Sequence, residues 1–386
     1  MKILKKISLK DILGIFIFAL LIIPAFIRKH VLKKELWLIC EHLTARDNGY
    51  VFFKYMREKH PEIPCYYAID YNHNDFKKVK KLGNTVKWGS IKHYYYYMSA
   101  TWNLSSHKNG SPNHALFSAL RLKLNLYNNF VFLQHGVLYQ NHEMFHKNKS
   151  KFKYFVCGAK PEYDFLLEKY GYSDKELVYT GLARFDNLHN TKCDEKVILY
   201  MPTYRRYLED KESLKNSEYY KKIISFINSK ELNELLEKND KYLYFCPHNG
   251  FKENVDLFYS NNERVKIIDI SKQDVQELLI KGSLLITDFS SLHTDFAYMK
   301  KPIIYYQYDK KDFDEKHIGK YVKDTYFDYK KDAFGKVVET EKQLINELEN
   351  IIKNKQTNEY EERINTFFQL HDKKNCERLY IIIKGE

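Results

Sequence analysis

Residues 284–306 read LLITDFSSLHTDFAYMKKPIIYY and predict a strand, a hydroxyl-rich turn, a helix and a second strand. Residues 284–287 form the short apolar run that is typical of a parallel strand covered on both faces. A second apolar run begins at Pro302, after the helix expected at 292–299. A strand, a helix and a strand in this order join through a right-handed crossover, so the stretch predicts a parallel α/β sheet.

The turn between these two strands is predicted to bind phosphate. Ser290 and Ser291 fall where the helix begins, so their hydroxyls and the N–H groups of the first helical turn converge there. That point is the positive end of the helix dipole, where an anion is stabilised. The alternative is that the two serines only cap the helix.

Apolar runs alternate with helical patterns along most of the chain, and the polar stretch 189–196 divides them into two series. This alternation predicts two doubly wound, Rossmann-like domains that face each other across a cleft, the GT-B architecture of the α/β class. The chain of 386 residues is long enough for both. The expected strands are 36–40, 65–69, 101–104, 131–133, 152–157 and 178–180 in the first series, and 197–200, 242–246, 265–268, 284–287 and 302–306 in the second.

The predicted division of the chain follows these two series. It consists of a membrane-associated segment at 1–34, a first domain at 35–190, a second domain at 191–370, and a C-terminal helix at 371–386 that packs back on the first domain. A capping box, Thr340-Glu-Lys-Gln343, predicts another helix that ends near Asn354.

Residues 12–27 form an apolar run with cationic residues on both sides. As a helix the run reaches roughly 24 Å, short of the ~30 Å hydrocarbon core. Basic residues follow it where a signal-peptide cleavage site belongs, which disfavours cleavage. The pattern predicts a peripheral anchor on the cytoplasmic face of the cell membrane, and the alternative is a buried core helix. The flanking cations are Lys2, Lys5, Lys6 and Lys10 before the run, and Arg28, Lys29, Lys33 and Lys34 after it.

Lysine and arginine outnumber aspartate and glutamate by 63 to 50, a formal net charge of +13. Such an excess favours polyanionic partners: nucleic acid, anionic lipid or a phosphate polymer. The lysines are spread along the chain without a nucleic-acid-binding signature, which argues against DNA or RNA. The six cysteines have no CxxC or CxxH spacing, so they are expected to be reduced core residues of a cytosolic protein.

Four separated motifs can be read along the chain, and the last of them lies within residues 284–306. They are Gln134-His-Gly-Val, Gly181-Leu-Ala-Arg-Phe-Asp186, Met201-Pro-Thr-Tyr-Arg205, and Thr287-Asp-Phe-Ser-Ser291 with Asp295-Phe-Ala and Lys301-Pro-Ile-Ile-Tyr after it, and Pro247-His248 lies among them. In this order and spacing the chain resembles the CDP-glycerol glycerophosphotransferase family, the teichoic-acid primases and polymerases. It departs from the family at Gln134, where many members have Trp.

Two histidines that follow expected strands are the candidate catalytic groups, together with Asp288. His135 comes after the strand 131–133 and is the predicted base that takes the proton of an attacking hydroxyl. His248 comes after the strand 242–246 and is expected to stabilise the charge that develops as CMP leaves. Asp288 is expected to orient His248 or a donor hydroxyl, and its alternative is a turn-forming role.

The predicted substrate-binding residues lie in or beside the same motifs. Arg205 offers a bidentate fork that matches phosphate, and Gly136 allows a close approach of the backbone to a ligand. The full set is Gly136, Arg184, Thr203, Arg205, Pro247, Thr287, Ser290, Ser291 and Asp295. Asp312-Phe-Asp314 has the spacing of a metal motif but lies in a run of Lys and Asp, so a solvated loop is expected, with no catalytic metal and no cofactor.

The resemblance implies a transferase for teichoic-acid, capsule or related cell-wall polymer synthesis. It would move a polyol phosphate, most simply glycerol phosphate, from a CDP-activated donor to a hydroxyl of a lipid-linked or anionic polymeric acceptor at the cytoplasmic membrane surface, releasing CMP. The alternatives are a CDP-ribitol ribitolphosphotransferase and a GT-B glycosyltransferase that uses a UDP-sugar. A third, non-enzymatic alternative is a module that binds teichoic acid or membrane through charge alone.

Overall fold

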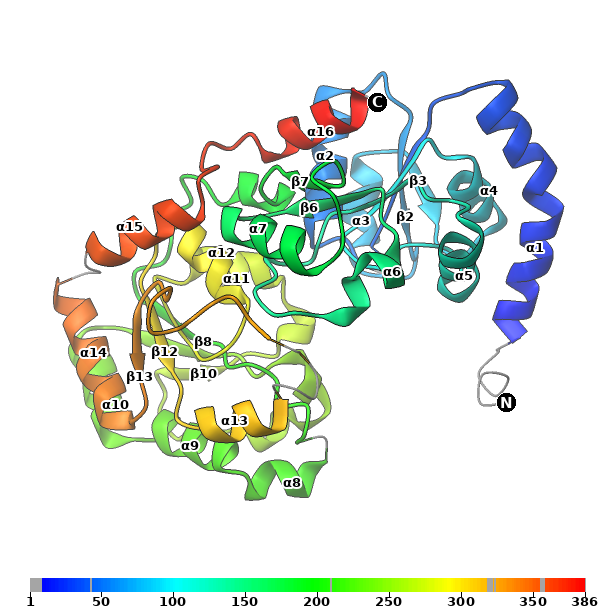
Figure 1. Cartoon of the computed structure of the whole chain (residues 1–386). Coiled ribbons are helices and arrows are strands. Elements are labelled where there is room, and N and C mark those ends of the chain that lie inside the picture. The colour runs from blue at the N-terminus through cyan, green and yellow to red at the C-terminus, as the bar shows by residue number, and fades with distance from the viewer. Residues whose placement is uncertain are drawn as a thin grey trace. The chain divides into compact units, whose positions relative to one another are not determined.

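The computed structural model describes residues 9–41, 44–208, 210–317, 322, 324–354 and 358–385. The chain forms two compact units, each built on its own parallel sheet (Figure 1). Unit 1 comprises Met1–Val137, Glu143–Asn187 and Asp372–Glu386, and unit 2 comprises Leu138–His142 and Leu188–His371. Two doubly wound parallel sheets confirm the predicted α/β class.

Among the described residues, unit 1 contains a seven-stranded sheet with the order β3-β2-β1-β4-β5-β6-β7. Every neighbouring pair is parallel, and the interior strand β1 pairs through Trp37 with Cys65 on one side and Trp102 on the other. All four residues of β1 are buried, as the apolar run predicts. The strands are β1 (Trp37–Cys40), β2 (Cys65–Ile69), β3 (Thr85–Lys87), β4 (Trp102–Ser105), β5 (Phe130–Phe132), β6 (Tyr154–Cys157) and β7 (Leu177–Tyr179).

Helices connect these strands, and side-chain caps begin several of them. Asp47 caps α2, Ser90 caps α4 and Asn113 caps α5, each by accepting a backbone N–H of the first turn. The helices of unit 1 are α1 (Leu9–Phe26), α2 (Asn48–Lys59), α3 (Phe76–Lys81), α4 (Ile91–Ser99), α5 (His114–Leu124), α6 (Lys147–Ser150), α7 (Lys160–Lys169) and α16 (Asn375–Lys384). Helix α16 is tied to the rest of unit 1 where Asp186 accepts the N–H groups of Asn375 and Cys376.

The N-terminal helix is longer than the sequence predicted. Helix α1 continues into a π-helical turn, and Asp11–Val31 is long and apolar enough to cross a membrane. One face packs on α4 and α5 (Figure 1). The Phe18 and Phe117 ring centroids lie 5.9 Å apart in this contact. The other face exposes Phe16 and Leu20. The predicted lysines at 2, 5 and 6 lie outside the described residues.

In the part of unit 2 that the structure describes, six parallel strands follow the order β10-β9-β8-β11-β12-β13. Strands β11 and β12 are the two predicted from residues 284–306, and both are fully buried. The strands are β8 (Val197–Tyr200), β9 (Tyr242–Phe245), β10 (Val265–Ile267), β11 (Leu284–Thr287), β12 (Ile303–Tyr306) and β13 (Lys336–Val338). The order reverses between β8 and β11, as it does between β1 and β4 in unit 1.

The helices of unit 2 include one that the sequence analysis expected to be a loop. Asp312 and Asp314 lie on α13, where they pair with Lys316 and Lys310 one turn away, so the Lys-Asp run forms i,i+4 ion pairs along a helix. The predicted capping box is confirmed by hydrogen bonds between Thr340 and Gln343. The helices are α8 (Lys211–Asn216), α9 (Glu218–Ile227), α10 (Lys230–Lys238), α11 (Val275–Lys281), α12 (Leu292–Tyr298), α13 (Lys310–His317), α14 (Glu341–Asn354) and α15 (Asn358–Phe367).

Candidate functional site

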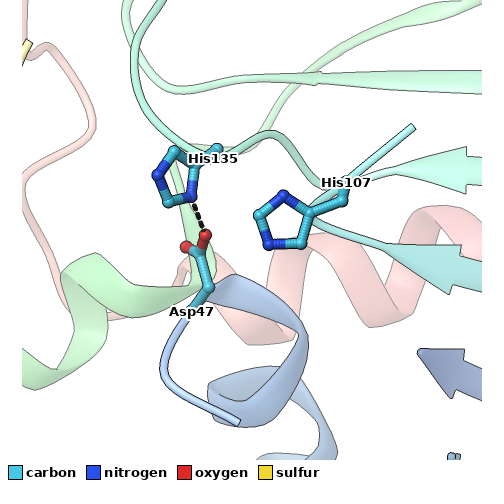
Figure 2. A group of neighbouring side chains, drawn as sticks. All are labelled: Asp47, His107 and His135. Atoms are coloured by element: carbon cyan, nitrogen blue, oxygen red, sulfur yellow. Dashed lines mark hydrogen bonds and ion pairs between the residues drawn. The ribbon is translucent and has the colours of Figure 1, made fainter. Parts of the chain in front are cut away.

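Three polar residues meet at the carboxyl edge of the unit 1 sheet. Asp47 follows β1, His107 follows β4 and His135 follows β5, and these three strands are consecutive neighbours in the sheet. The strand order reverses between β1 and β4, and open α/β sheets bind ligands beyond the carboxyl ends of their strands at such a point. Figure 2 shows the three side chains pointing toward one another.

His135 and Asp47 form a hydrogen-bonded dyad between Nδ1 and Oδ2 (Figure 2). The imidazole side chain is 77% exposed, whereas that of Asp47 is 7% exposed. Burial opposes ionisation of Asp47, but the charges of His135 and Arg184 outweigh it and hold the pKa of the carboxyl well below its usual range. In turn, the Asp47 carboxylate raises the pKa of His135 above its ordinary value, although the positive charge of Arg184 acts in the opposite direction.

This pairing decides which nitrogen of His135 can accept a proton. An ionised carboxylate only accepts hydrogen bonds, so Nδ1 carries the hydrogen in the neutral imidazole and Nε2 carries the lone pair. A carboxylate in this position holds the tautomer and orientation of the ring and stabilises the imidazolium that forms. In chemical terms, this arrangement can accept a proton at Nε2 from a hydroxyl that reaches it.

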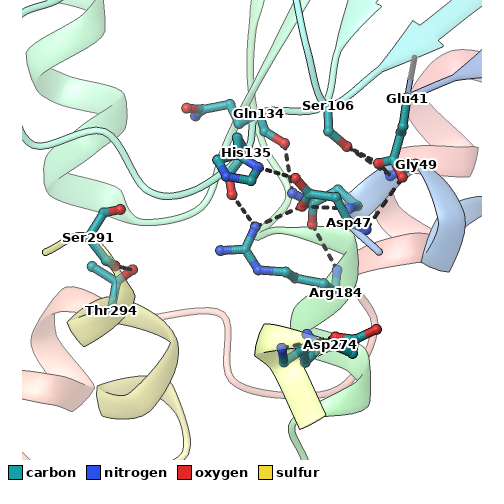
Figure 3. Close-up of polar contacts among 12 residues, drawn as sticks. Glu41, Asp47, Gly49, Ser106, Gln134, His135, Arg184, Asp274, Ser291 and Thr294 are labelled. Atoms are coloured by element: carbon teal, nitrogen blue, oxygen red, sulfur yellow. Dashed lines mark hydrogen bonds and ion pairs between the residues drawn. The ribbon is translucent and has the colours of Figure 1, made fainter. Parts of the chain in front are cut away.

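Hydrogen bonds from buried polar groups hold the dyad in place. Arg184 donates from Nη1 to Asp47 Oδ1 at 3.0 Å and to the carbonyl oxygen of His135. The Arg184 backbone N–H donates to the side chain of Asn48 at 2.9 Å, and Asn48 donates to the carbonyl oxygen of Gln134 at 2.8 Å. Figure 3 shows Arg184 beside Asp47 and His135. Arg184, predicted to bind substrate, is 8% exposed. In this structure its guanidinium bonds both residues of the dyad and so fixes their positions.

Gln134, which departs from the family pattern, anchors the turn that presents His135. Its backbone has φ 61°, in the left-handed region, and its side chain is buried. Nε2 donates to the carbonyl oxygen of Val156 at 2.6 Å and to the carboxylate of Glu162 at 2.8 Å. Because these bonds draw Gln134 into the unit, the chain turns and places His135 and the half-buried Gly136 on the outside.

His107 lies beside the dyad, with its ring centroid 5.2 Å from that of His135. The possible ligand atoms of Asp47, His107 and His135 lie within 4.8 Å of one another, close enough to consider a metal. However, Asp47 already accepts from His135 and pairs with Arg184, so a cation would have to displace a hydrogen bond and an ion pair beside an existing positive charge. The contacts favour a dyad with a neighbouring histidine.

The second group of predicted residues lies at the switch point of the unit 2 sheet. Loops after the consecutive strands β9, β8 and β11 carry His248, Thr203 and Asp288 respectively. Asp288 accepts the backbone N–H of Thr203 at 2.8 Å and its hydroxyl at 2.6 Å. Asp288 therefore joins the loop after β8 to the loop after β11. These bonds do not include the predicted contact in which Asp288 would orient His248.

Arg205 is placed differently from its predicted role. Its side chain is 0% exposed, and Nη2 donates to Asp288 and Asp309 at 2.7 Å each, while Nε also donates to Asp309 at 2.7 Å. The guanidinium fork that was expected to hold phosphate is thus occupied by two carboxylates. A buried cation needs such partners because an unpaired charge is costly to desolvate. Arg205 in this structure is a structural bridge.

His248 has the features of a side chain that can donate a hydrogen bond to a phosphate oxygen. Its Nδ1 accepts the backbone N–H of Gly250 at 2.9 Å, and its ring stacks on Tyr204 with 5.2 Å between centroids. Burial lowers the pKa of His248 to about 4, although the negative charge of Asp288 acts in the opposite direction. The ring is therefore neutral at pH 7, and Nε2 carries the hydrogen because Nδ1 is an acceptor. The preceding Pro247 is buried.

The predicted phosphate turn is reproduced only in part. Ser290 and Ser291 lie before α12, and Ser290 Oγ accepts the N–H of Leu292 at 3.4 Å. Ser291 is exposed. Thr287 and Asp295 were also predicted to bind substrate, but both are buried, and the Thr287 hydroxyl donates to a carbonyl oxygen inside the unit. These two residues belong to the part of the fold that supports the turn.

Asp47, Asn48 and His107 are not among the residues predicted from the sequence. The stretch Asp47-Asn-Gly at the start of α2 is an N-cap signal that could have drawn attention to Asp47. His107 follows the expected strand 101–104 after a short polar turn, the same position relative to a strand that singled out His135. Nothing local to the sequence indicated that the two would lie beside His135.

Comparisons with known proteins agree with the fold and the motifs. A family model described as CDP-Glycerol:Poly(glycerophosphate) glycerophosphotransferase matches residues 22–385. Minor teichoic acid biosynthesis protein GgaB of Bacillus subtilis (strain 168) is 31% identical over 365 residues, 90% of this chain and 39% of that protein. Teichoic acid poly(glycerol phosphate) polymerase of the same strain is 25% identical over 338 residues, 79% of this chain and 42% of that protein.

Among solved structures, the wall teichoic acid polymerase TagF has a TM-score of 0.68 and 19% identity, over 91% of this chain and 89% of that chain. This likeness supports the predicted GT-B-like fold. The chain spans about two fifths of the length of the two curated relatives.

Proposed function

The chain belongs to the CDP-glycerol:poly(glycerophosphate) glycerophosphotransferase family, and from this membership we propose that it transfers glycerol phosphate from CDP-glycerol to a hydroxyl of a lipid-linked or polymeric acceptor. The product is an extended teichoic-acid or related cell-surface polymer, and CMP is released. The observation that carries the proposal is the Asp47–His135 dyad at the switch point of unit 1. It is an oriented base in a position where a hydroxyl substrate can reach it.

The proposed reaction is a direct displacement at phosphorus. The acceptor oxygen forms a bond to the phosphorus of glycerol phosphate, and the phosphoanhydride bond to CMP breaks. The bonding electron pair leaves with the CMP oxygen, while the hydroxyl proton passes to Nε2 of His135. The dyad's contribution is to hold the lone pair of Nε2 toward solvent and to stabilise the imidazolium through Asp47.

We assign the donor to unit 2 and the acceptor to unit 1. His248 supports the donor assignment because a neutral ring with hydrogen on Nε2 can donate to a phosphate oxygen without needing protonation. Ser290 and Ser291 add hydroxyls and N–H groups before α12. Arg205 and Asp288 act behind these groups by joining the loops that carry them.

The N-terminal segment is proposed to hold the enzyme on the cytoplasmic face of the cell membrane. Helix α1 buries one face against α4 and α5, which ties it to unit 1 along its length. Its opposite face exposes Phe16, Leu20 and Ile23, and the cations Arg28, Lys29, Lys33 and Lys34 follow it. A helix with an apolar outer face and basic flanks suits the boundary between acyl chains and anionic head groups.

A donor screen tests the proposed function. Purified protein is incubated with a short glycerol phosphate polymer and, separately, CDP-glycerol, CDP-ribitol or a UDP-sugar, and the released nucleotide and the product are measured. Release of CMP with polymer growth on CDP-glycerol is the expected result. Preference for CDP-ribitol would change the polyol, and UDP release with sugar transfer would favour a glycosyltransferase. Binding of the polymer without turnover of any donor would favour a non-enzymatic module.

A further inference from the structure

Glu41 is a buried carboxyl that the proposed reaction does not use. It directly follows β1, at the start of the loop that leads to Asp47, and is 1% exposed. A glutamate is rarely buried this deeply unless donors hold it, because removing a charge from water is costly. The donors that surround Glu41 therefore show what the group does in the fold.

Those donors come from three elements that meet behind the dyad. Oε1 accepts the backbone N–H of Gly49 at 2.7 Å and the hydroxyl of Ser106 (Figure 3). Oε2 accepts the hydroxyl of Tyr67, on β2, at 2.8 Å and the backbone N–H of Asp47 at 3.4 Å. Glu41 thus links β1, β2, the loop after β4 and the first turn of α2.

Two of these bonds satisfy N–H groups that the start of α2 leaves without helical partners. Asp47 and Glu41 share this helix start, because Asp47 accepts the N–H of Asn48 while Glu41 accepts those of Asp47 and Gly49. A Cβ atom at Gly49 would lie 2.8 Å from Oε1 of Glu41, closer than real contacts allow. The sequence therefore needs a glycine at 49 for the carboxyl to approach.

Glu41 also interacts electrostatically with both residues of the dyad. Burial, reinforced by the negative charge of Asp47, raises the pKa of Glu41 to about 7, although its hydrogen bonds favour the ionised form. Tyr67 remains a neutral donor because burial, and then the charge of Glu41, raise its pKa well above the ordinary value. Asp47 and, to a smaller extent, Glu41 raise the pKa of His135, and the positive charge of Arg184 opposes this rise.

We propose that Glu41 is a positioning residue for the base: its side chain fixes the first turn of α2 so that Asp47 meets His135, and its negative charge acts on the same dyad. Its effect on turnover rests on the proposed role of His135, but its effect on the imidazole does not. When Glu41 loses its proton, the added negative charge favours the protonated imidazole. Loss of the two protons is then anticooperative, and the titration of His135 is broadened.

Glu41→Gln tests this inference because it keeps the shape and a hydrogen-bond acceptor but removes the charge. The titration of His135 is followed by NMR of labelled imidazole side chains in the full chain, with the His135 signal assigned by its loss in His135→Ala. The midpoint is expected to fall by about 0.5 pH unit, as expected for one removed charge at moderate distance, and the curve to become sharper. His107, with its ring centroid 5.2 Å from that of His135, is present in both proteins, so the difference between the two curves reports Glu41. An unchanged midpoint and shape would overturn the inference.

Tyr67→Phe is a second variant that leaves Glu41 in place. Removing the Tyr67 hydroxyl takes one donor from Oε2 and keeps Glu41 protonated to higher pH, so a smaller shift of His135 in the same direction is expected. Glu347→Gln is the matched control: Glu347 is a buried glutamate of unit 2 that pairs with Lys336 at 3.0 Å. It should leave the His135 titration unchanged, and an equal shift in this control would overturn the inference.

Turnover separates failure of this inference from failure of the proposed function. In Glu41→Gln the acidic limb of kcat should move to lower pH with the His135 midpoint, while KM for CDP-glycerol stays within about twofold because the donor groups are in unit 2. If the imidazole shifts but the limb does not, the inference on Glu41 stands and His135 is not the base. If His135→Ala is inactive but Glu41→Gln shifts neither quantity, the base stands and the inference fails.

Discussion

Asp47 lies 88 residues before His135 in the chain, and one oxygen of its carboxylate meets Nδ1 of that histidine. The other oxygen accepts the N–H of Asn48 and begins helix α2. The orientation of the imidazole is therefore tied to the start of a helix that packs on the sheet. Because the His135 side chain is largely exposed, its replacement should affect chemistry more than folding.

Replacing His135 with Ala removes the proposed base. Turnover should fall by about 10²–10⁴, the usual contribution of a positioned base, while the affinity for CDP-glycerol changes little. Initial rates of CMP release and calorimetric donor binding give the two quantities. His73→Ala is a suitable control, since His73 is a histidine of unit 1 that contacts Asp75. Near-normal turnover in purified, folded His135→Ala would exclude this residue as the base.

Asp47→Asn should shift the pH dependence as well as the rate. Asp47 is the main cause of the raised pKa of His135, so a neutral amide lets the imidazole lose its proton at lower pH. The acidic limb of kcat should move to lower pH, and kcat on the plateau should fall by about 10²-fold or more because the ring is no longer held in one tautomer. Asn still caps helices well, so α2 should persist. A limb that stays in place would contradict the dyad.

Replacing Arg205 should lower the free energy of unfolding, because its guanidinium is bonded inside unit 2 and does not face the proposed donor. Removing its charge, as in Arg205→Met, leaves Asp288 and Asp309 buried without a cation, which costs about 3–5 kcal/mol of unfolding free energy. Denaturant unfolding of the full chain measures this cost. As a matched control, Arg378→Met removes the partly exposed pair with Asp372 and should cost much less. A normal stability in Arg205→Met would reject the bridge.

Two faces of α1 should respond differently to substitution. Phe16→Glu with Leu20→Glu places charges on the exposed face and should release the protein from anionic vesicles without lowering its melting temperature. Phe18→Ala removes packing against Phe117 and should lower the melting temperature while vesicle binding persists. Vesicle sedimentation and thermal unfolding distinguish the two effects. Sedimentation of the double variant at the level of the natural chain would place the anchor elsewhere.

Turnover should not depend on a divalent metal at the dyad. Asp47 is engaged by His135 and Arg184, so a bound cation would compete with the contacts that orient the base. Protein treated with EDTA, passed into metal-free buffer and assayed for CMP release should keep its turnover. Loss of activity that is restored by added Mg²⁺ or Mn²⁺ would show that the enzyme needs a metal, and a much higher metal concentration needed for restoration in His107→Ala would place the metal at this cluster.

Local patterns in the sequence were sufficient for much of the fold. Buried strands such as β11 and β12 are short runs of apolar residues, and their type depends on neighbours within a few positions. The capping box at Thr340 is likewise a local signal. The edge strands β3 and β13 were missed because each buries only one residue and so carries no apolar run. The charged run at 310–317 was misread since its i,i+4 pairs stabilise a helix as readily as water solvates a loop.

By itself the sequence determined the strands and turns, the position of His135 after a strand, and the pair of serines before α12. These features depend on hydrogen bonds and side-chain volumes within a few residues. Only the tertiary structure decided that Asp47 would hold His135, and that Arg205 would face Asp309, 104 residues away, instead of solvent. Such partners are chosen by the order of strands in each sheet and by the cost of burying an unpaired charge, and neither is written in the neighbouring residues.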